Sequence, residues 1–159
     1  MTCYTCHNND HLDDLPMYEL IALDTHWRAA HAFDTALPGW LVLVPRRHVT
    51  TIADLTDAEA VDLGAWQVRL SRALQAVIGC VKTYVVQFAE KDGFSHVHFH
   101  VIPRMGDIPD ERRGSGVFEY LGQPPEQSVT DKQKHELAYA FRAYLDRHPL
   151  MPTTANIVT

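Results

Sequence analysis

Three histidines alternate with apolar residues in the segment HVHFHV, at positions 96, 98 and 100. Successive side chains of a β-strand point to opposite faces, so His96, His98 and His100 would share one face. The valines and the phenylalanine between them would then face a hydrophobic core. Near neutral pH an imidazole can bind a metal ion, exchange a proton or act as a nucleophile. A lone histidine is usually an ordinary polar side chain, but three in register indicate a functional site.

A second group of potential ligands stands at the start of the chain, where Cys3 and Cys6 form a C-x-x-C pair. In a reducing compartment such a pair is more typical of metal binding or redox chemistry than of a structural disulfide. Tetrahedral zinc takes four nitrogen or sulfur ligands, and C-x-x-C is a common half of such a site. The pair alone is weak support for a metal, and free thiols remain the simplest alternative.

The composition is that of a globular protein, with 159 residues, 46% hydrophobic and 21% charged. A net charge of −6 makes general binding to a nucleic-acid polymer improbable, although one basic pocket could still hold a nucleotide. No apolar run reaches the roughly 20 residues of a membrane span. The start MTCYTCHNND has neither the basic nor the apolar region of a signal peptide, so we expect a cytoplasmic protein.

Five segments predict strands, because they are rich in β-branched and aromatic residues and are bounded by turn residues. They are residues 18–24, 28–34, 41–45, 82–90 and 94–104. The Lys-Asp-Gly sequence between the last two is typical of a turn, so we expect these two to pair as a hairpin.

Two helices are predicted by capping boxes followed by apolar periodicity. One begins at Thr56 and Glu59 and ends at Gly79, and the other begins at Thr130 and Gln133 and ends near residue 147. The glycine- and proline-rich segment 105–129 between them and the last predicted strand is expected to be a loop or flap. We expect a single α+β domain over residues 1–159 with its core at about 15–145, and with the C-x-x-C segment and the C-terminal tail peripheral.

The segment HVHFHVI resembles the His-φ-His-φ-His-φ-φ signature of the histidine triad (HIT) superfamily, in which φ is apolar. PGWLVLVPRRH is similar to an upstream family segment that ends in a basic pair and a histidine, and VIPRMGD is similar to the Fhit-like branch. The resemblance covers roughly residues 15–145. It implies a HIT-like fold, a five-stranded antiparallel sheet with two main helices, normally a homodimer with one nucleotide pocket per subunit.

The resemblance also implies attack on the α-phosphorus of a nucleotide ester. His98 would be the nucleophile and form a nucleotidyl-histidine intermediate that water cleaves, because neutral imidazole is nucleophilic and leaves well. His100 would contact the phosphate and assist the leaving group as an acid, and His96 would complete the catalytic triad. The neighbouring imidazoles and strand amides can stabilise the developing charge, so no magnesium is required in principle.

Three further residues are candidates for substrate binding by the same resemblance. Asp34 stands near the position that holds the ribose, and Gln87 stands where the family often has an Asn or Gln that reaches the phosphate. Ser95 precedes the triad, but the Gly-Gln-Ser or Gly-Gln-Thr of many members is replaced by EKDGFSHVH. For Asp34, an ordinary turn role is equally open.

A subset of bacterial HIT proteins is similar in having an N-terminal C-x-x-C with structural zinc. The resemblance therefore implies zinc ligation by Cys3, Cys6, His48 and His96, with His7 and His11 as alternatives close in sequence. Trp27, Trp40 and Trp66 are expected to serve mostly in packing, although Trp40 follows a Pro-Gly turn and could approach a base.

Together these residues predict a HIT-type nucleotide hydrolase or nucleotidyltransferase acting on a dinucleoside polyphosphate or a nucleoside phosphoramidate. The first alternative is a zinc-stabilised nucleotide-binding module with little or no turnover, which the missing Gly-Gln-Ser segment motivates. The second is a metal-binding protein in which all the histidines and cysteines serve the ion.

Overall fold

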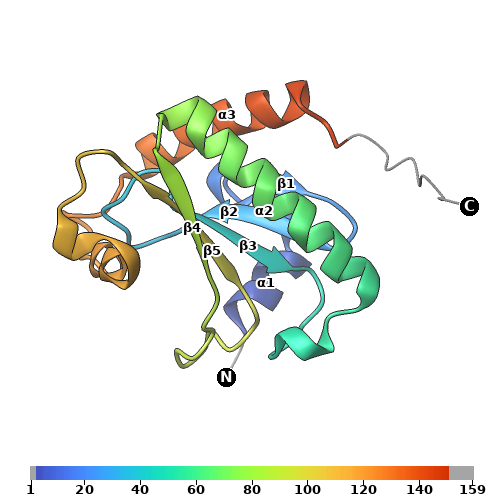
Figure 1. Ribbon diagram of the computed structural model, residues 1–159. Coiled ribbons are helices and arrows are strands. Elements are labelled where there is room, and N and C mark those ends of the chain that lie inside the picture. Colours follow the sequence, from blue (N-terminus) through green and yellow to red (C-terminus); the bar gives the residue numbers. More distant parts are fainter. Residues whose placement is uncertain (1–2, 151–159) are drawn as a thin grey trace, which may run out of the picture.

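The computed structural model describes residues 3–150, and the C-terminal tail predicted to be peripheral lies outside the described residues. Its strands are β1 (Ala22–Leu23), β2 (Trp27–His31), β3 (Leu41–Pro45), β4 (Lys82–Val86) and β5 (Phe99–Arg104). They form one antiparallel sheet in the order β1-β2-β3-β5-β4, with β4 and β1 at the edges (Figure 1). The predicted five-stranded antiparallel sheet is therefore confirmed.

Both predicted long helices are present and begin at their capping boxes. They are α2 (Asp57–Ile78) and α3 (Asp131–Arg147). In each cap the threonine hydroxyl accepts from the backbone N–H of the third helical residue, whose side chain accepts from the backbone N–H of the threonine. Gly79 ends α2 in the left-handed conformation, at a φ of +71°, which glycine adopts without steric cost. These local signals need no tertiary contact, which explains why the sequence reveals them.

The predicted strand 41–45 coincides with β3, and the other four predicted strands are longer than the observed ones. Of residues 18–24 only Ala22 and Leu23 pair in the sheet, because residues 17–19 form a turn of 3₁₀ helix that directs Glu19 inward. The predicted strand 28–34 ends at His31, and Asp34 in the turn that follows takes a φ of +44°. The last strand begins only at Phe99, so His96 and His98 lie in the segment before it.

Two segments not predicted as helical are helical in the structure. A short helix, α1 (Tyr4–Asp10), contains Cys6 and buries Thr5 and Asn8. The predicted loop 105–129 contains two segments of 3₁₀ helix, at residues 110–112 and 114–120. None of the helices within residues 3–150 combines the length and the apolar composition that crossing a membrane requires.

The sheet has one face covered by helices and one face that holds a cavity. On the covered face, alternate residues of β2, β3 and β5 pack against α2 and α3, among them Leu41, Leu43, Phe99 and Val101. Val97, Phe99 and Val101 are at most 5% exposed, as the alternating pattern predicts. On the opposite face, α1 lies near one end and residues 114–120 cover the other, around Trp40 and Ile102.

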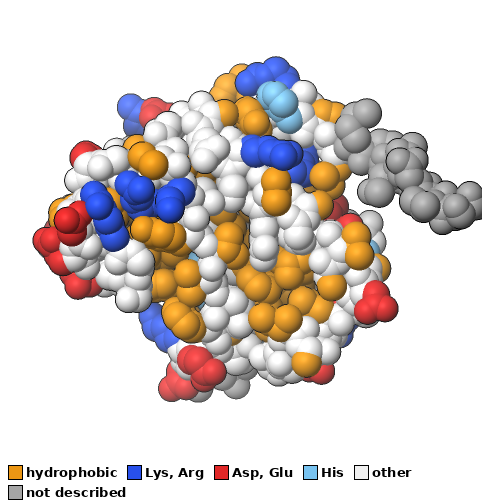
Figure 2. All heavy atoms as spheres, viewed as in Figure 1, with side chains coloured by type: hydrophobic (Ala, Val, Ile, Leu, Met, Phe, Trp, Pro, Cys, Tyr) orange, Lys and Arg blue, Asp and Glu red, His pale blue; other side chains and the backbone are white. Residues whose placement is uncertain are grey.

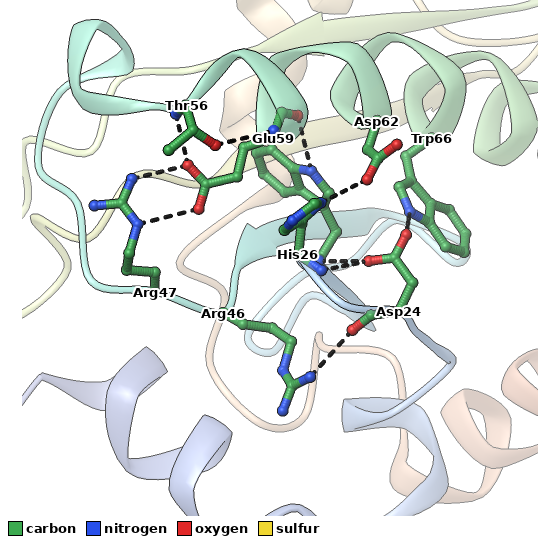
Figure 3. A network of polar contacts seen from close by, with 9 residues as sticks. Asp24, His26, Arg46, Arg47, Thr56, Glu59, Asp62 and Trp66 are labelled. Carbon is green, nitrogen blue, oxygen red and sulfur yellow. Dashed lines mark hydrogen bonds and ion pairs between the residues drawn. The ribbon is translucent and has the colours of Figure 1, made fainter.

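Polar contacts fasten two loops to the beginning of α2 (Figure 3). Glu59 accepts from Arg47 Nε at 3.1 Å, from Arg47 Nη2 at 2.8 Å and from the Thr56 backbone at 2.8 Å. The Asp24 carboxylate accepts from the backbones of residues 26 and 27 and from Trp66 Nε1. The first of these networks fixes the chain immediately before His48, a predicted metal ligand.

We expect Glu59→Gln to lower the free energy of unfolding by roughly 1–3 kcal/mol at pH 7, because the side chain keeps its cap but loses its charge. The lower part of the range is favoured because Arg47 is 49% exposed and solvent screens the pair. The hydrogen bond from Arg47 lowers the pKa of Glu59 from 4.5 to about 2. The ionised form therefore stabilises the folded state above pH 4.5, and this contribution is lost as the pH falls toward 2.

Urea unfolding of both proteins between pH 7 and pH 3 measures this difference. The matched control is Glu136→Gln, whose carboxylate lies in an exposed pair 3.9 Å from Lys132 and should change stability by less than about 0.5 kcal/mol. A difference between wild type and Glu59→Gln that stays constant down to pH 3 would contradict the ion-pair explanation.

Candidate functional site

A cavity of about 390 Å³ lies on the open face of the sheet, bounded by α1 at one end and by residues 118–122 at the other. His98 and His100 both line it, and their rings meet edge to face at 4.9 Å between centroids. His96 is not among the lining residues. The predicted row of three imidazoles is therefore divided between two environments.

Each histidine of the triad gives one ring nitrogen to a fixed partner. His96 Nε2 lies 3.0 Å from the Pro45 carbonyl oxygen, and His98 Nδ1 lies 2.9 Å from the carbonyl oxygen of His96. Carbonyl oxygens only accept, so these two ring nitrogens carry protons. His100 Nδ1 lies 3.0 Å from Trp40 Nε1, and an indole nitrogen only donates, so this ring nitrogen is the acceptor.

The remaining nitrogens of His98 and His100 are accessible. Neither Nε2 atom makes a hydrogen bond within residues 3–150, and neither is among the fully buried unpaired atoms of that part of the chain. In a neutral His98, Nε2 holds the free electron pair, whereas in a neutral His100, Nε2 holds the proton. Burial lowers the pKa of His100 to about 4, so this ring is neutral at pH 7. With a neutral His98, the cavity thus contains one ring nitrogen with a free electron pair beside one N–H donor.

The third histidine turns toward the cysteine pair. One ligand atom from each of Cys3, Cys6, His48 and His96 lies within 4.8 Å of all the others. His48 Nδ1 is 3.2 Å from His96 Nδ1 and 3.2 Å from Cys6 Sγ, and the two sulfurs are 3.5 and 3.6 Å from His96 Nδ1. Ligands at 2.0–2.3 Å in a tetrahedron are separated by about 3.3–3.8 Å, so these four separations are close to those of a zinc site.

The protonation of these groups also suits a metal. His96 donates from Nε2 to Pro45, which leaves Nδ1 unprotonated and directed at the cluster. Burial lowers the pKa of His96 to about 4, so its ring is neutral as a ligand must be. Burial and the neighbouring Cys3 raise the pKa of the Cys6 thiol to about 11, and a bound dication would offset this cost. His7 and His11, the alternative ligands, lie outside the cluster with their rings tilted against each other at 4.5 Å between centroids.

A polar network ties α1 to the sheet between the cluster and the cavity. Arg28, on β2, is 2% exposed; it donates from Nε to Asn9 at 2.8 Å and from Nη1 to the carbonyl of Glu19. Glu19 also accepts from the Tyr4 hydroxyl at 2.9 Å, and Asn9 donates to the carbonyls of Pro45 and Arg46. Burial and Glu19 raise the pKa of Tyr4 to about 12, so its hydroxyl is a donor at neutral pH.

The three predicted substrate-binding residues lie in different places. Asp34 lines the cavity, and burial raises the pKa of its carboxyl group. Gln87 is half-buried and Ser95 is exposed, and neither lines the cavity.

Several cavity residues have no signal in the sequence. Three aromatic rings meet at one end with centroids 5.4–5.7 Å apart, and Phe118 and Lys91 also contribute to the walls. The three are Tyr4, Phe33 and Phe94, which come from three distant segments. Their faces offer the apolar surface on which a planar ring can stack.

Comparison with known proteins identifies the family of this chain. Residues 18–107 match the HIT domain. The chain is 29% identical over 109 residues to the bis(5'-adenosyl)-triphosphatase of Dictyostelium discoideum, which covers 66% of this chain and 73% of that protein. It is 28% identical over 108 residues, or 65% of its length, to the nitrilase and fragile histidine triad fusion protein NitFhit of Caenorhabditis elegans, and spans only 24% of that protein.

Solved structures share the fold. A zinc-bound histidine triad family protein from Mycobacterium smegmatis superposes with a TM-score of 0.64 at 20% identity, over 92% of this chain and 95% of that one. A diadenosine triphosphate hydrolase from Plasmodium falciparum, in complex with cyclomarin A, gives a TM-score of 0.64 at 15% identity, over 84% of this chain and 80% of that one. The matched domain includes the triad and covers more than half of the sequence, so this chain belongs to the HIT domain family.

Proposed function

We propose that the protein is a nucleotide hydrolase or nucleotidyltransferase in which His98 Nε2 attacks the α-phosphorus of a nucleotide ester. The observation that carries this proposal is the 2.9 Å hydrogen bond from His98 Nδ1 to the His96 carbonyl, which leaves the electron pair on the nitrogen that is accessible at the cavity. The related bis(5'-adenosyl)-triphosphatase and the diadenosine triphosphate hydrolase of the same fold support a dinucleoside polyphosphate as substrate. A nucleoside phosphoramidate is the second substrate class.

With a dinucleoside polyphosphate, a P–N bond forms at His98 in the first step, and the bond from phosphorus to the leaving oxygen breaks with its electron pair on that oxygen. With a phosphoramidate, the leaving amine nitrogen takes the electron pair of the broken P–N bond together with a proton from solvent. Water then attacks the phosphorus, the P–N bond breaks, the electron pair returns to His98 Nε2, and the proton of water passes to solvent. A nucleoside polyphosphate leaving group is a stable anion near pH 7 and needs no acid. His100 therefore acts by donating a hydrogen bond to a phosphate oxygen, because a neutral imidazole is a poor acid.

The rest of the cavity suits a nucleoside. The aromatic cluster of Tyr4, Phe33 and Phe94 offers ring faces to a base, and the Asp34 carboxylate can accept from ribose hydroxyls. Gln87 and Ser95 lie outside the cavity, so they do not contact the phosphate. Lys91 lines the cavity and supplies a positive charge for phosphate in their place.

We expect His98→Asn to lower kcat for hydrolysis of diadenosine triphosphate by at least about 10³-fold, because no other cavity group is a nucleophile in the same position. The measurement is release of mononucleotide, run on a panel that includes a nucleoside phosphoramidate. The fold by circular dichroism and the metal content should not change. His135→Asn, an exposed histidine on α3, is the control, and turnover that survives in His98→Asn would refute the nucleophile assignment.

The position of Gln87 and Ser95 outside the cavity favours one alternative, a nucleotide-binding module with little turnover. In that case nucleotides would raise the melting temperature of the protein while no substrate of the panel released mononucleotide.

We also propose that Cys3, Cys6, His48 and His96 hold a structural zinc ion. The separations of the four ligand atoms and the hydrogen bond from His96 to Pro45 support it, as does the zinc-bound structure of the same fold. When bound, the ion would join α1 to the segments that carry His48 and His96. The same helix places Tyr4 and Thr5 at the cavity, so its attachment also shapes the substrate site.

Purified protein should contain about one zinc ion per chain, and the Cys3→Ser, Cys6→Ser double variant should contain almost none, because two of four ligands are lost. Cys80→Ser, which removes a buried cysteine outside the cluster, is the matched control and should keep the metal. Elemental analysis gives the stoichiometry, and a double variant with a full complement of zinc would rule out this ligand set.

We propose, finally, that the protein is a homodimer formed through the β4 edge. Within residues 3–150 the outer edge of β4 has no strand partner, and Val81, Val85 and Phe88 are 42–60% exposed on and beside it. Figure 2 shows hydrophobic side chains at the surface in this region and beside α2, where Val68 is 48% exposed. Such a patch is typical of an interface.

Sedimentation equilibrium should therefore give a mass near twice 18.0 kDa for wild type. Val85→Asp should shift the mass to that of a monomer, because dimer formation would then bury a carboxylate in an apolar interface at a high cost in free energy. Val61→Asp, at a residue that is 74% exposed on α2, is the control. A wild-type mass of one chain at all concentrations would exclude the dimer.

A further inference from the structure

Trp40, in the turn before β3, donates a hydrogen bond to His100 of the triad. Its side chain is fully buried, and its Nε1 lies 3.0 Å from His100 Nδ1. From the sequence, Trp40 could have approached a base. Its side chain does not line the cavity, so it is not in a position to do so. The contact follows from the register of the sheet, because Val42 pairs with His100 and Trp40 stands two residues earlier on the same face.

The indole is packed against His100 by neighbouring rings, and its backbone is bonded on both sides. It meets the ring of His100 edge to face at 5.6 Å and the ring of Phe118 at 5.4 Å, and Phe118 also touches His100 at 5.5 Å. Its backbone carbonyl accepts from Ala32 at 2.8 Å, and its backbone amide donates to Leu37. The three aromatic rings and two backbone bonds therefore fix the direction of the indole N–H.

A second buried histidine holds the turn that carries Trp40. His31 donates from Nδ1 to the Ala32 carbonyl at 2.7 Å, so its Nε2 is an acceptor and receives the Gly39 amide at 2.9 Å. Gly39 has a φ of +84°, and a Cβ there would lie 2.7 Å from Ile78 Cδ1. The turn is thus closed on one side by His31 and on the other by α2.

We infer that Trp40 is a positioning residue that keeps His100 in the tautomer with its only proton on Nε2, facing the cavity. The alternative tautomer would place an N–H against the indole N–H, two donors with no acceptor between them, which is unfavourable in a buried site. The burial that keeps His100 uncharged supports the same state. An Nε2–H donor would stabilise negative charge on a phosphate oxygen in the transition state. For this catalytic consequence the inference rests on the proposed function.

The test compares wild type with Trp40→Phe, which keeps an aromatic ring and removes the N–H. Two-bond ¹H–¹⁵N spectra of histidine-labelled protein at neutral pH report the tautomer of each ring, with His100 assigned from its absence in His100→Gln. Wild type should show a single Nε2–H tautomer for His100, and Trp40→Phe should show a mixture. The value of kcat should fall about tenfold while KM changes much less, because the bond acts mainly on the transition state.

The matched control is Trp66→Phe, which removes another indole N–H from a buried tryptophan, one that donates to Asp24 far from the cavity. It should lower stability but leave the His100 signals and kcat at the wild-type values. If Trp40→Phe does not fold, replacement of Trp40 alone by benzothienylalanine keeps the two-ring shape and exchanges the N–H for sulfur.

Three outcomes overturn the inference. They are a wild-type His100 that is charged or protonated on Nδ1, an unchanged single tautomer after loss of the Trp40 N–H, and a changed tautomer with wild-type kcat. A fall in kcat without a change of tautomer belongs to the second outcome and indicates a packing role. If no substrate is hydrolysed by wild type, the proposed function fails, while the spectra still decide whether Trp40 sets the tautomer.

Discussion

The chemistry of the three triad histidines is set by which nitrogen of each ring is already bound. Backbone carbonyls accept hydrogen bonds from His96 Nε2 and His98 Nδ1, and an indole N–H donates a hydrogen bond to His100 Nδ1. Because each ring has only two nitrogens, these bonds decide what the other nitrogen can do. The free nitrogen of His96 faces a cluster of sulfur and nitrogen ligands. That of His98 offers an electron pair to the cavity, and that of His100 offers an N–H donor.

This division depends on where pairing in the sheet stops. The ladder between β3 and β5 ends at the pair Leu43 and Phe99. The carbonyl of His96 lies outside the ladder, so it can accept from the His98 ring, while Val97 still bonds to Val49. The side chains of residues 96–98 keep the alternation of a strand, which retains Val97 in the core. Their backbone does not pair with β3 in the ladder, so it can bring His96 against Pro45. A continuous strand would have used the backbone groups that here orient the rings.

The sequence predicts best the features that depend on near neighbours. The capping boxes at Thr56 and Thr130 are complete within four residues, and both helices begin there. The alternation of residues 96–101 also gives the buried face correctly, and the predicted cysteine and histidine ligands do meet. The same alternation extends beyond the point where β3 can pair, so it overestimates the strand. The contacts of Tyr4, Phe33 and Phe94 join residues up to 90 positions apart in the chain, and no periodicity encodes them.

The buried pair of Arg28 and Glu19 explains how a short helix can hold a defined position. A buried ion pair contributes little net stability, because desolvation opposes the attraction, but its directional hydrogen bonds allow few arrangements. Here the pair connects Tyr4 and Asn9 of α1 to β2 and to the carbonyls before His48. The helix is consequently placed by polar geometry on the cavity side of the sheet, while apolar packing dominates the other side. The cysteine pair and one end of the cavity wall belong to the same seven-residue helix and its cap, so whatever fixes one of them also fixes the other.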